Sequence, residues 1–214
     1  MDNYVLPTKP KPSEKYLELI EAYKHLHKEE GKFQGISIVP FVVDLYSIIQ
    51  YNKCKSLLDY GCGKAVGYTQ NFKNIDPKKK IPNFNVPLHT YWGIEDLSLY
   101  DPGTLEYPTL PSKKCDLVIC TDVLEHIPED DLDWLIREIC SLANTTVFLN
   151  VSCQLAKKTF TTGKYKGENV HVSVFDHAWW VDKIKTIHKD YKELKIYLTC
   201  TSKEGILGTC IKGD

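Results

Sequence analysis

Four short, mainly apolar runs constrain the fold of this chain most strongly, because none of them alternates regularly with polar residues. They cover residues 56–60, 97–101, 116–121 and 146–151. Runs of this length are typical of strands buried on both faces of a parallel sheet. A helix is expected between the last two runs, where Pro128 precedes three carboxylates that favour the positive end of a helix dipole. Strand, helix and strand in this order predict a βαβ unit and therefore an α/β fold.

The two ends of the chain add helices and a hairpin to this sheet. Ser13 can cap a first helix, which we expect to end near Gly31. Pro40 predicts the start of a second helix. Near the C-terminus, apolar segments at 194–200 and 206–211 flank a five-residue loop, which suits an antiparallel hairpin. The expected sheet is therefore mostly parallel, with an antiparallel hairpin at one edge.

Composition and charge place the chain among ordinary globular domains. It has 214 residues, of which 43% are hydrophobic, and a formal net charge of −1, so one domain without disulfides is expected. None of the eight cysteines forms a C-x-x-C pair, which favours free thiols in a reducing cytoplasm. No apolar run approaches a signal segment or a membrane span, so we expect a cytoplasmic protein without a membrane partner. The basic run Lys78–Lys80 is interpreted as a solvated loop.

A glycine-rich bend directly follows the first expected strand. Residues 61–67 read Gly-Cys-Gly-Lys-Ala-Val-Gly, and glycines at such a bend let the backbone approach a ligand closely. Asp59 lies within the end of the apolar strand, where a carboxylate costs free energy unless it is paired or hydrogen-bonded. A dinucleotide fingerprint would need its third glycine one residue before Gly67, which disfavours a nicotinamide cofactor. The bend and the acid together predict a ligand site.

Residues 58–63, Leu-Asp-Tyr-Gly-Cys-Gly, and residues 115–128 form two motifs in a familiar order. They resemble the first motif, and the fourth strand with the helix after it, of the class I S-adenosylmethionine-dependent methyltransferases. More loosely, residues 100–103, 121–132 and 167–173 resemble small methyltransferase-like proteins of tailed marine phages, whose substrates are generally unassigned. A phage-encoded protein would act in the host cytoplasm. The resemblance implies a Rossmann-like three-layer sandwich that binds S-adenosylmethionine.

This resemblance also implies a division of the chain and a set of cofactor contacts. Residues 1–53 would form a tail and an N-terminal helical cap or lid, and residues 54–214 the methyltransferase core of one compact domain. Asp59 would orient the glycine loop or the ammonium group of the cofactor. The implied cofactor-binding residues are Asp59, Tyr60, Gly61, Cys62, Gly63, Asp101, Thr121, Asp122 and Val123.

The acid that would bind the ribose of the cofactor has an unusual spacing. In the family it usually follows the glycines by about 20 residues, whereas Asp101 follows Gly63 by 38. Glu95 and Asp96 come sooner but precede the apolar run. We favour Asp101, because an acid followed by Pro-Gly at a strand end lies at the carboxyl edge, where ligands bind in open α/β sheets. The extra residues then lengthen the first crossover, a short third strand remains before Cys115, and the adenine contacts stay unassigned.

Methyl transfer to oxygen or nitrogen requires alignment of the acceptor and removal of its proton. Histidine titrates near neutral pH, so His171 and His126 are the candidate catalytic bases, although each could instead be a structural residue or a pocket wall. The candidate substrate-binding residues are Phe33 and Gln34, which precede the first strand, and Trp179. The tryptophan pair that contains Trp179 could instead anchor a helix onto the sheet.

The expected acceptor is a small molecule or a sugar-like compound. No [DN]-P-P-[YF] tetrapeptide follows the fourth family strand and the chain has no Pro-Cys pair, which argues against both familiar routes of DNA base methylation. No metal is expected, because Asp122 and Asn150 are only a fragment of a catechol-type metal site. Three alternatives stay open: a macromolecular acceptor (RNA, DNA or protein), a cofactor-binding module without turnover, and a nicotinamide dehydrogenase. The oligomeric state also stays open.

Overall fold

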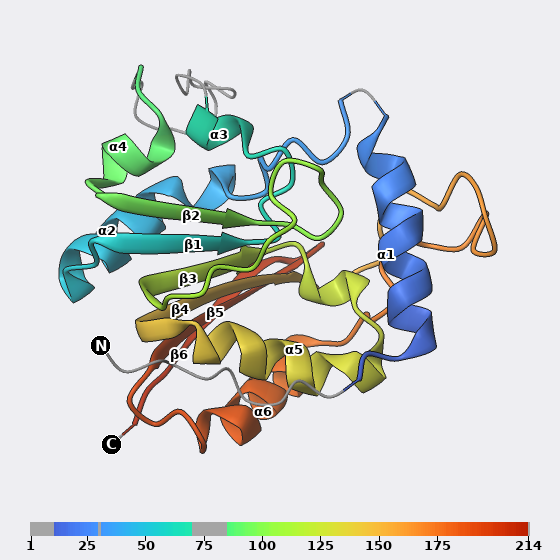
Figure 1. The fold of residues 1–214 in the computed structure, drawn as a ribbon. Helices are drawn as coiled ribbons and strands as arrows, with labels where there is room; N and C mark the ends of the chain where they lie inside the picture. The colour runs from blue at the N-terminus through green and yellow to red at the C-terminus, as the bar shows by residue number, and fades with distance from the viewer. Residues whose placement is uncertain (1–10, 30, 70–84, 214) are drawn as a thin grey trace.

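A six-stranded sheet lies at the centre of the fold (Figure 1). The structure, a computed structural model, describes residues 11–29, 31–69 and 85–213, so part of the lengthened first crossover, residues 70–84, falls outside these ranges. Within them the strand order is β2-β1-β3-β4-β5-β6. The strands are β1 (Ser56–Tyr60), β2 (Asp96–Tyr100), β3 (Cys115–Thr121), β4 (Ala143–Ser152), β5 (Lys195–Ser202) and β6 (Gly205–Ile211). Strands β1 to β5 are parallel and β6 is antiparallel to β5, so the predicted sheet and hairpin are confirmed.

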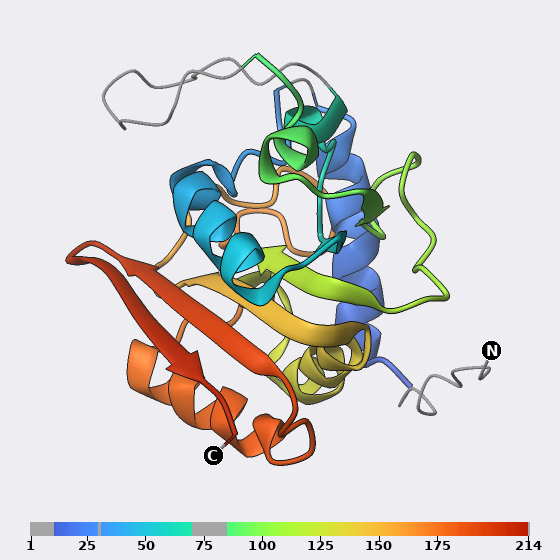
Figure 2. The ribbon, with the colours of Figure 1, turned by 90° about the vertical axis from the view of Figure 1, so that its left-hand side faces the viewer.

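Helices cover both faces of the sheet and complete three layers (Figure 1, Figure 2). One face carries η1 (Val39–Phe41), α2 (Val42–Asn52), α3 (Val66–Thr69) and α4 (Leu88–Trp92), and the other α5 (Glu129–Ser141) and α6 (His177–His188). One face of α5 is buried in the core through Leu132, Leu135, Ile136 and Ile139. This layout confirms the Rossmann-like three-layer sandwich. None of the described helices is long and apolar enough to cross a bilayer.

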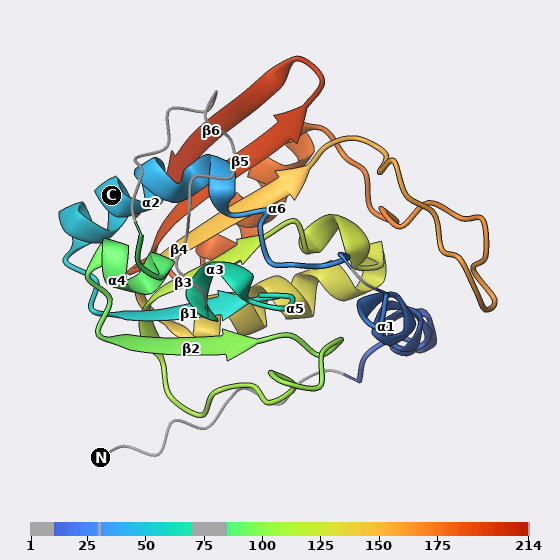
Figure 3. The same cartoon turned by 90° about the horizontal axis from the view of Figure 1, so that it is seen from above.

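Helix α1 (Glu14–His27) lies across the carboxyl ends of the strands (Figure 1, Figure 3). Ser13 caps it as predicted, because its side chain accepts a hydrogen bond from the N–H of Tyr16 at 3.0 Å. The N–H of Ser13 also donates to Oδ1 of Asp131 on α5 at 2.9 Å. Tyr16 packs edge-on against Trp134, with ring centroids 5.2 Å apart. The predicted N-terminal cap therefore divides into two parts. Helix α1 covers the carboxyl edge of the sheet, whereas α2 belongs to the helical layer on one face.

Three details differ from the sequence predictions. Helix α1 ends at His27 and does not continue to Gly31. The hairpin loop is shorter than predicted, because β5 and β6 stay paired as far as Ser202 and Gly205. The prediction of a short third strand before Cys115 is wrong, because residues 101–114, all of them described, contain no strand. Three prolines in that segment lack the N–H that a strand ladder needs.

Candidate functional site

A cavity of about 450 Å³ opens at the carboxyl ends of β1 and β3. Its walls are the glycine loop after β1, the end of β3, part of α1, and the loops 33–37 and 154–158. Strands β2 and β3 flank β1 on opposite sides, so the strand order reverses at this point. Ligands of open α/β sheets bind at such switch points. The volume also falls within the roughly 300–1,000 Å³ of small-molecule sites.

The glycine loop packs closely against its neighbours. A Cβ atom on Gly61, which has φ +86°, would lie 2.3 Å from Cγ2 of Val123. A Cβ atom on Gly63, which has φ +57°, would lie 2.5 Å from the carbonyl oxygen of Phe33. Both positions therefore require glycine, for backbone conformation and for space. Segment 33–37 of the chain therefore packs closely against this loop, and the loop also lines the cavity.

Backbone donors of the glycine loop are engaged within the protein. The hydrogen bonds run from Gly61 and Cys62 to the Tyr100 carbonyl (2.7 and 3.1 Å), from Gly63 to the Asp101 carboxylate (2.9 Å), from Lys64 to the Phe33 carbonyl (2.8 Å) and from Val66 to the Gln34 carbonyl (3.1 Å). The loop is thus held from one side by the end of β2 and from the other by segment 33–37. Its shape does not depend on a ligand.

Asp59 borders the cavity with a carboxyl group that has one free oxygen. The residue is 3% exposed, and its Oδ2 accepts a hydrogen bond from the hydroxyl of Tyr68 at 2.9 Å. Its Oδ1 has no hydrogen-bond partner among the described residues. Burial raises the pKa of this carboxyl group from 3.8 to about 7, although the bond from Tyr68 acts in the opposite direction. Because an unmet buried acceptor is costly, the position suits a ligand donor, and a cationic donor best.

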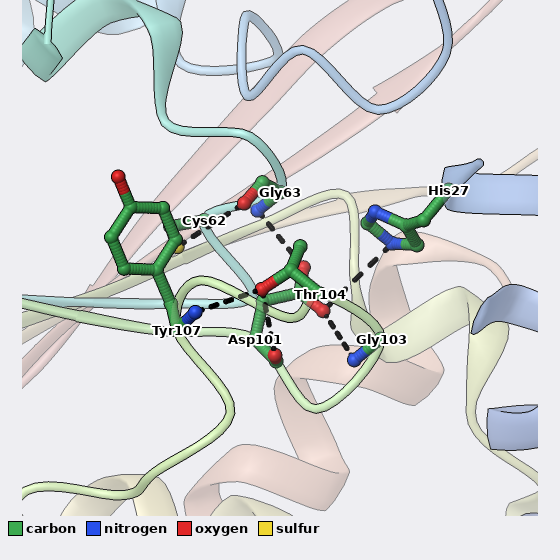
Figure 4. A network of polar contacts seen from close by, with 7 residues as sticks. All are labelled: His27, Cys62, Gly63, Asp101, Gly103, Thr104 and Tyr107. Carbon is green, nitrogen blue, oxygen red and sulfur yellow. Dashed lines mark hydrogen bonds and ion pairs between the residues drawn. The ribbon is translucent and has the colours of Figure 1, made fainter. Parts of the chain in front are cut away.

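Asp101 follows β2 and is held beside the glycine loop (Figure 4). Its Oδ2 accepts from the N–H of Gly63 at 2.9 Å and its Oδ1 from the N–H of Gly103 at 2.7 Å. Nε2 of His27 lies 3.8 Å from Oδ1. An ionised carboxylate has about four acceptor positions, so Asp101 keeps capacity for the hydroxyl groups of a ligand.

The two competing acids lie at the opposite end of β2. Glu95 pairs with Lys55 at 2.7 Å, and Asp96 pairs with Lys113. Neither acid lines the cavity. The geometry therefore favours Asp101 over both alternatives as the acid at the ligand edge.

Two histidines form part of the cavity wall: His126, the last residue of η3 (Leu124–His126), and His171. Nδ1 of His126 lies 2.9 Å from the carbonyl oxygen of Val170, and Nδ1 of His171 lies 2.6 Å from that of Gln154. Burial lowers the pKa of His126 to about 3, so its ring is neutral near pH 7. Since a carbonyl only accepts hydrogen bonds, these contacts place a proton on each Nδ1, and Nε2 is the ring nitrogen of each histidine that stays available to a ligand.

Glu125 lies next to these histidines and is fully buried. Its Oε1 accepts from the N–H of Ser152 at 2.8 Å, whereas its Oε2 has no partner among the described residues. One atom each of Glu125, His126 and His171, all of a kind that binds metals, lie within 4.8 Å of one another. Burial raises the pKa of the Glu125 carboxyl group well above its ordinary value.

The structure brings nearly all of the predicted site residues to this one cavity. Those that line it are Phe33, Gln34, Asp59, Tyr60, Gly61, Cys62, Gly63, Asp101, Thr121, Asp122, Val123, His126 and His171. Trp179 does not line it, because it stacks on Phe175 with ring centroids 3.8 Å apart. Its neighbour Trp180 is fully buried in the core beneath α6, as the anchoring alternative described.

Sequence reasoning missed two residues of the site. His27 stacks on Phe33, with ring centroids 4.5 Å apart, and reaches Asp101. No pattern in the sequence marks it, because its role arises only when α1 folds over the sheet edge. Glu125 lies within the second motif, but sequence reasoning assigned it no role. Its signal was an acid within an otherwise apolar stretch, the same signal that identified Asp59.

Comparisons with protein-family models, with curated proteins and with solved structures find no match to this chain.

Proposed function

We propose that the protein is an S-adenosylmethionine-dependent methyltransferase that acts on an oxygen or nitrogen atom of a small-molecule or sugar-like acceptor. One observation carries this proposal: the glycine loop, the free oxygen of Asp59 and the carboxylate of Asp101 converge on one cavity at the switch point of the sheet. Both motifs that resemble the methyltransferases border the same cavity.

The residues of the cavity fit the polar groups of this cofactor. The free Oδ1 of Asp59 suits the ammonium group of the methionine part, because a buried acceptor favours a cationic donor. The remaining acceptor positions of Asp101 suit the two ribose hydroxyl groups. Gly61 and Gly63 line the cavity, and their backbone would lie beside the part of the cofactor between these groups. When bound, the cofactor supplies a methyl group on a positively charged sulfur.

Besides the residues assigned to the cofactor, the cavity lining includes apolar, imidazole and lysine side chains, and the lysines are Lys157 and Lys158. Phe33 offers an apolar ring, and His126 and His171 use Nδ1 for backbone carbonyls, so that Nε2 is the nitrogen left for the acceptor. As predicted general bases, the histidines could take the proton that an oxygen or nitrogen acceptor loses. The macromolecular alternative depended on Lys78–Lys80 and on the lysine-rich N-terminal tail, and both lie wholly or mostly outside the described residues. A cytoplasmic location stays part of the proposal and is supported by the eight cysteines, all of them free thiols.

Isothermal titration calorimetry with S-adenosylhomocysteine tests the proposed cofactor. We expect one binding site per chain, and no binding at tens of micromolar would overturn the proposal. Incubation with labelled S-adenosylmethionine and a small-molecule fraction of a cell lysate then tests turnover. An enzyme transfers label to a compound in that fraction, whereas a binding module transfers none.

The pH dependence of this binding should report on Asp59. In the free protein its carboxyl group has a pKa of about 7, so below that pH the group must lose a proton before it can pair with the cofactor's ammonium group. Affinity for S-adenosylhomocysteine should therefore rise about tenfold per pH unit up to about pH 7 and then level off. Calorimetry between about pH 5.5 and 8 measures this profile.

Asp59→Asn is the comparison variant, because its amide cannot ionise. Its affinity should be lower above pH 7 and should vary little with pH. The same raised pKa implies that unfolding of the ligand-free wild type becomes easier as pH rises from about 4 to 7, since ionisation then favours the unfolded chain. A wild-type affinity that is flat across this range would contradict the role given to Asp59.

A further inference from the structure

We propose that Glu125, His126 and His171 form a binding site for a divalent first-row transition-metal ion in the wall of the cavity. Two imidazoles and one carboxylate are a ligand set that such ions use, with coordination positions left open for other ligands. This site is distinct from the residues assigned to the cofactor.

The three ligand atoms are already close together. They lie within 4.8 Å of one another. With bonds of roughly 2.0–2.2 Å, three ligands of one ion lie about 3.3–3.8 Å apart, so side-chain rotations that shorten the longest separation by about 1 Å would close the site around an ion. The His126 and His171 rings meet edge to face, with centroids 4.8 Å apart.

Hydrogen bonds hold both imidazoles in the form that binds metal. A ligating histidine usually donates its other ring N–H to a carbonyl or carboxylate, which fixes the tautomer and the ring orientation. The Nδ1 atoms of His126 and His171 have such partners in the carbonyls of Val170 and Gln154. Nε2 of each ring therefore has its lone pair available.

Glu125 supplies an independent reason to expect a cation. The residue is fully buried, and its Oε2 has no partner among the described residues, while its Oε1 is fixed by the N–H of Ser152. A buried carboxylate oxygen without a donor is costly, and an ion bound between it and the two rings would satisfy it. The two histidine lone pairs would then bind the ion, so the metal role replaces the general-base role considered above.

An ion at this place would also define the acceptor more closely. Both histidines line the cavity, so an ion between them is within reach of a ligand there. Metal ions bind hydroxyl oxygens and make them more acidic. This step rests on the proposed function, and within it the expected acceptor is a hydroxyl-bearing compound whose oxygen binds the ion.

Co²⁺ binding to chelator-treated full-length protein tests the site. Calorimetry should show one ion per chain, and visible absorption should show the bands of Co²⁺ with nitrogen ligands. Glu125→Gln and His171→Gln should each weaken binding by more than about tenfold. His177→Gln is the matched control, because His177 lies on α6, contacts Thr209 and does not line the cavity.

The outcomes separate the metal site from the cofactor proposal. Absence of Co²⁺ binding in the wild type, or equal binding in wild type and a folded His171→Gln variant, would overturn the metal site. Thermal melting shows whether each variant is folded. If Glu125→Gln is unfolded, His171→Gln alone tests the site. Binding of S-adenosylhomocysteine is measured separately on metal-free protein, so its absence contradicts only the proposed function. If label transfer is observed, a chelator should reduce it at least tenfold, and undiminished transfer would contradict the link to the acceptor.

Discussion

Gly63→Ala is expected to abolish binding of S-adenosylhomocysteine at tens of micromolar and to lower the free energy of unfolding by about 3 kcal/mol. Two causes act together. Alanine is strained at φ +57°, and its Cβ would lie 2.5 Å from the backbone oxygen of Phe33. A backbone atom cannot rotate away as a side chain can, so segment 33–37 and the glycine loop must separate. Calorimetry and urea unfolding measure the two effects.

Gly93→Ala is the matched control for backbone strain. Gly93 ends α4 with φ +74°, and a Cβ there would meet nothing within 4 Å. This variant should lose only the roughly 1–2 kcal/mol of the left-handed conformation and should bind S-adenosylhomocysteine as the wild type does. Equal effects of the two substitutions would show that the contact between the loop and segment 33–37 is unimportant.

Asp101→Asn is expected to weaken S-adenosylhomocysteine binding by about 100-fold or more. Two hydrogen bonds to a charged acceptor contribute roughly 1.5–3 kcal/mol each, and each 1.4 kcal/mol is a factor of ten in affinity. The amide also places an NH2 group, which cannot accept, opposite one of the two N–H groups, those of Gly63 and Gly103, that now donate to the carboxylate. Calorimetry gives the affinity, and thermal melting reports any change in the loop.

Asp96→Asn controls for the loss of a negative charge on the same strand. Asp96 lies at the other end of β2, paired with Lys113, and does not line the cavity. Its affinity for S-adenosylhomocysteine should match that of the wild type. If instead Asp96→Asn weakens binding and Asp101→Asn does not, the ribose position has been assigned to the wrong acid.

Local apolar patterns were sufficient to predict the sheet. β1 coincides with the predicted run 56–60, and the other strands lie within a few residues of their predicted positions. A strand buried on both faces has to be apolar along its length, so its sequence shows it. The third strand was predicted wrongly because only the length of the segment was considered. The prolines between Asp101 and Cys115 remove N–H donors that a strand there would need.

The site was predictable where its residues follow a strand, and less so elsewhere. Asp59, Asp101 and Thr121 stand at or just after the carboxyl ends of strands, and parallel strands bring those ends to one edge. His27 reaches the same edge only because α1 crosses it, which no local pattern records. Trp179 was misplaced for a related reason: the direction of a helical side chain depends on how α6 packs against the sheet.

The engaged donors of the glycine loop have a consequence for ligand selectivity. Loops that hold phosphate groups do so with free backbone N–H groups. Here the N–H groups of Gly61 to Lys64 already donate to the Tyr100 carbonyl, the Asp101 carboxylate and the Phe33 carbonyl. A phosphate would have to displace these bonds and would also meet the carboxylate of Asp101. We therefore expect the loop to disfavour nucleotides with phosphate chains, such as ATP and NAD, relative to a nucleoside that carries no phosphate.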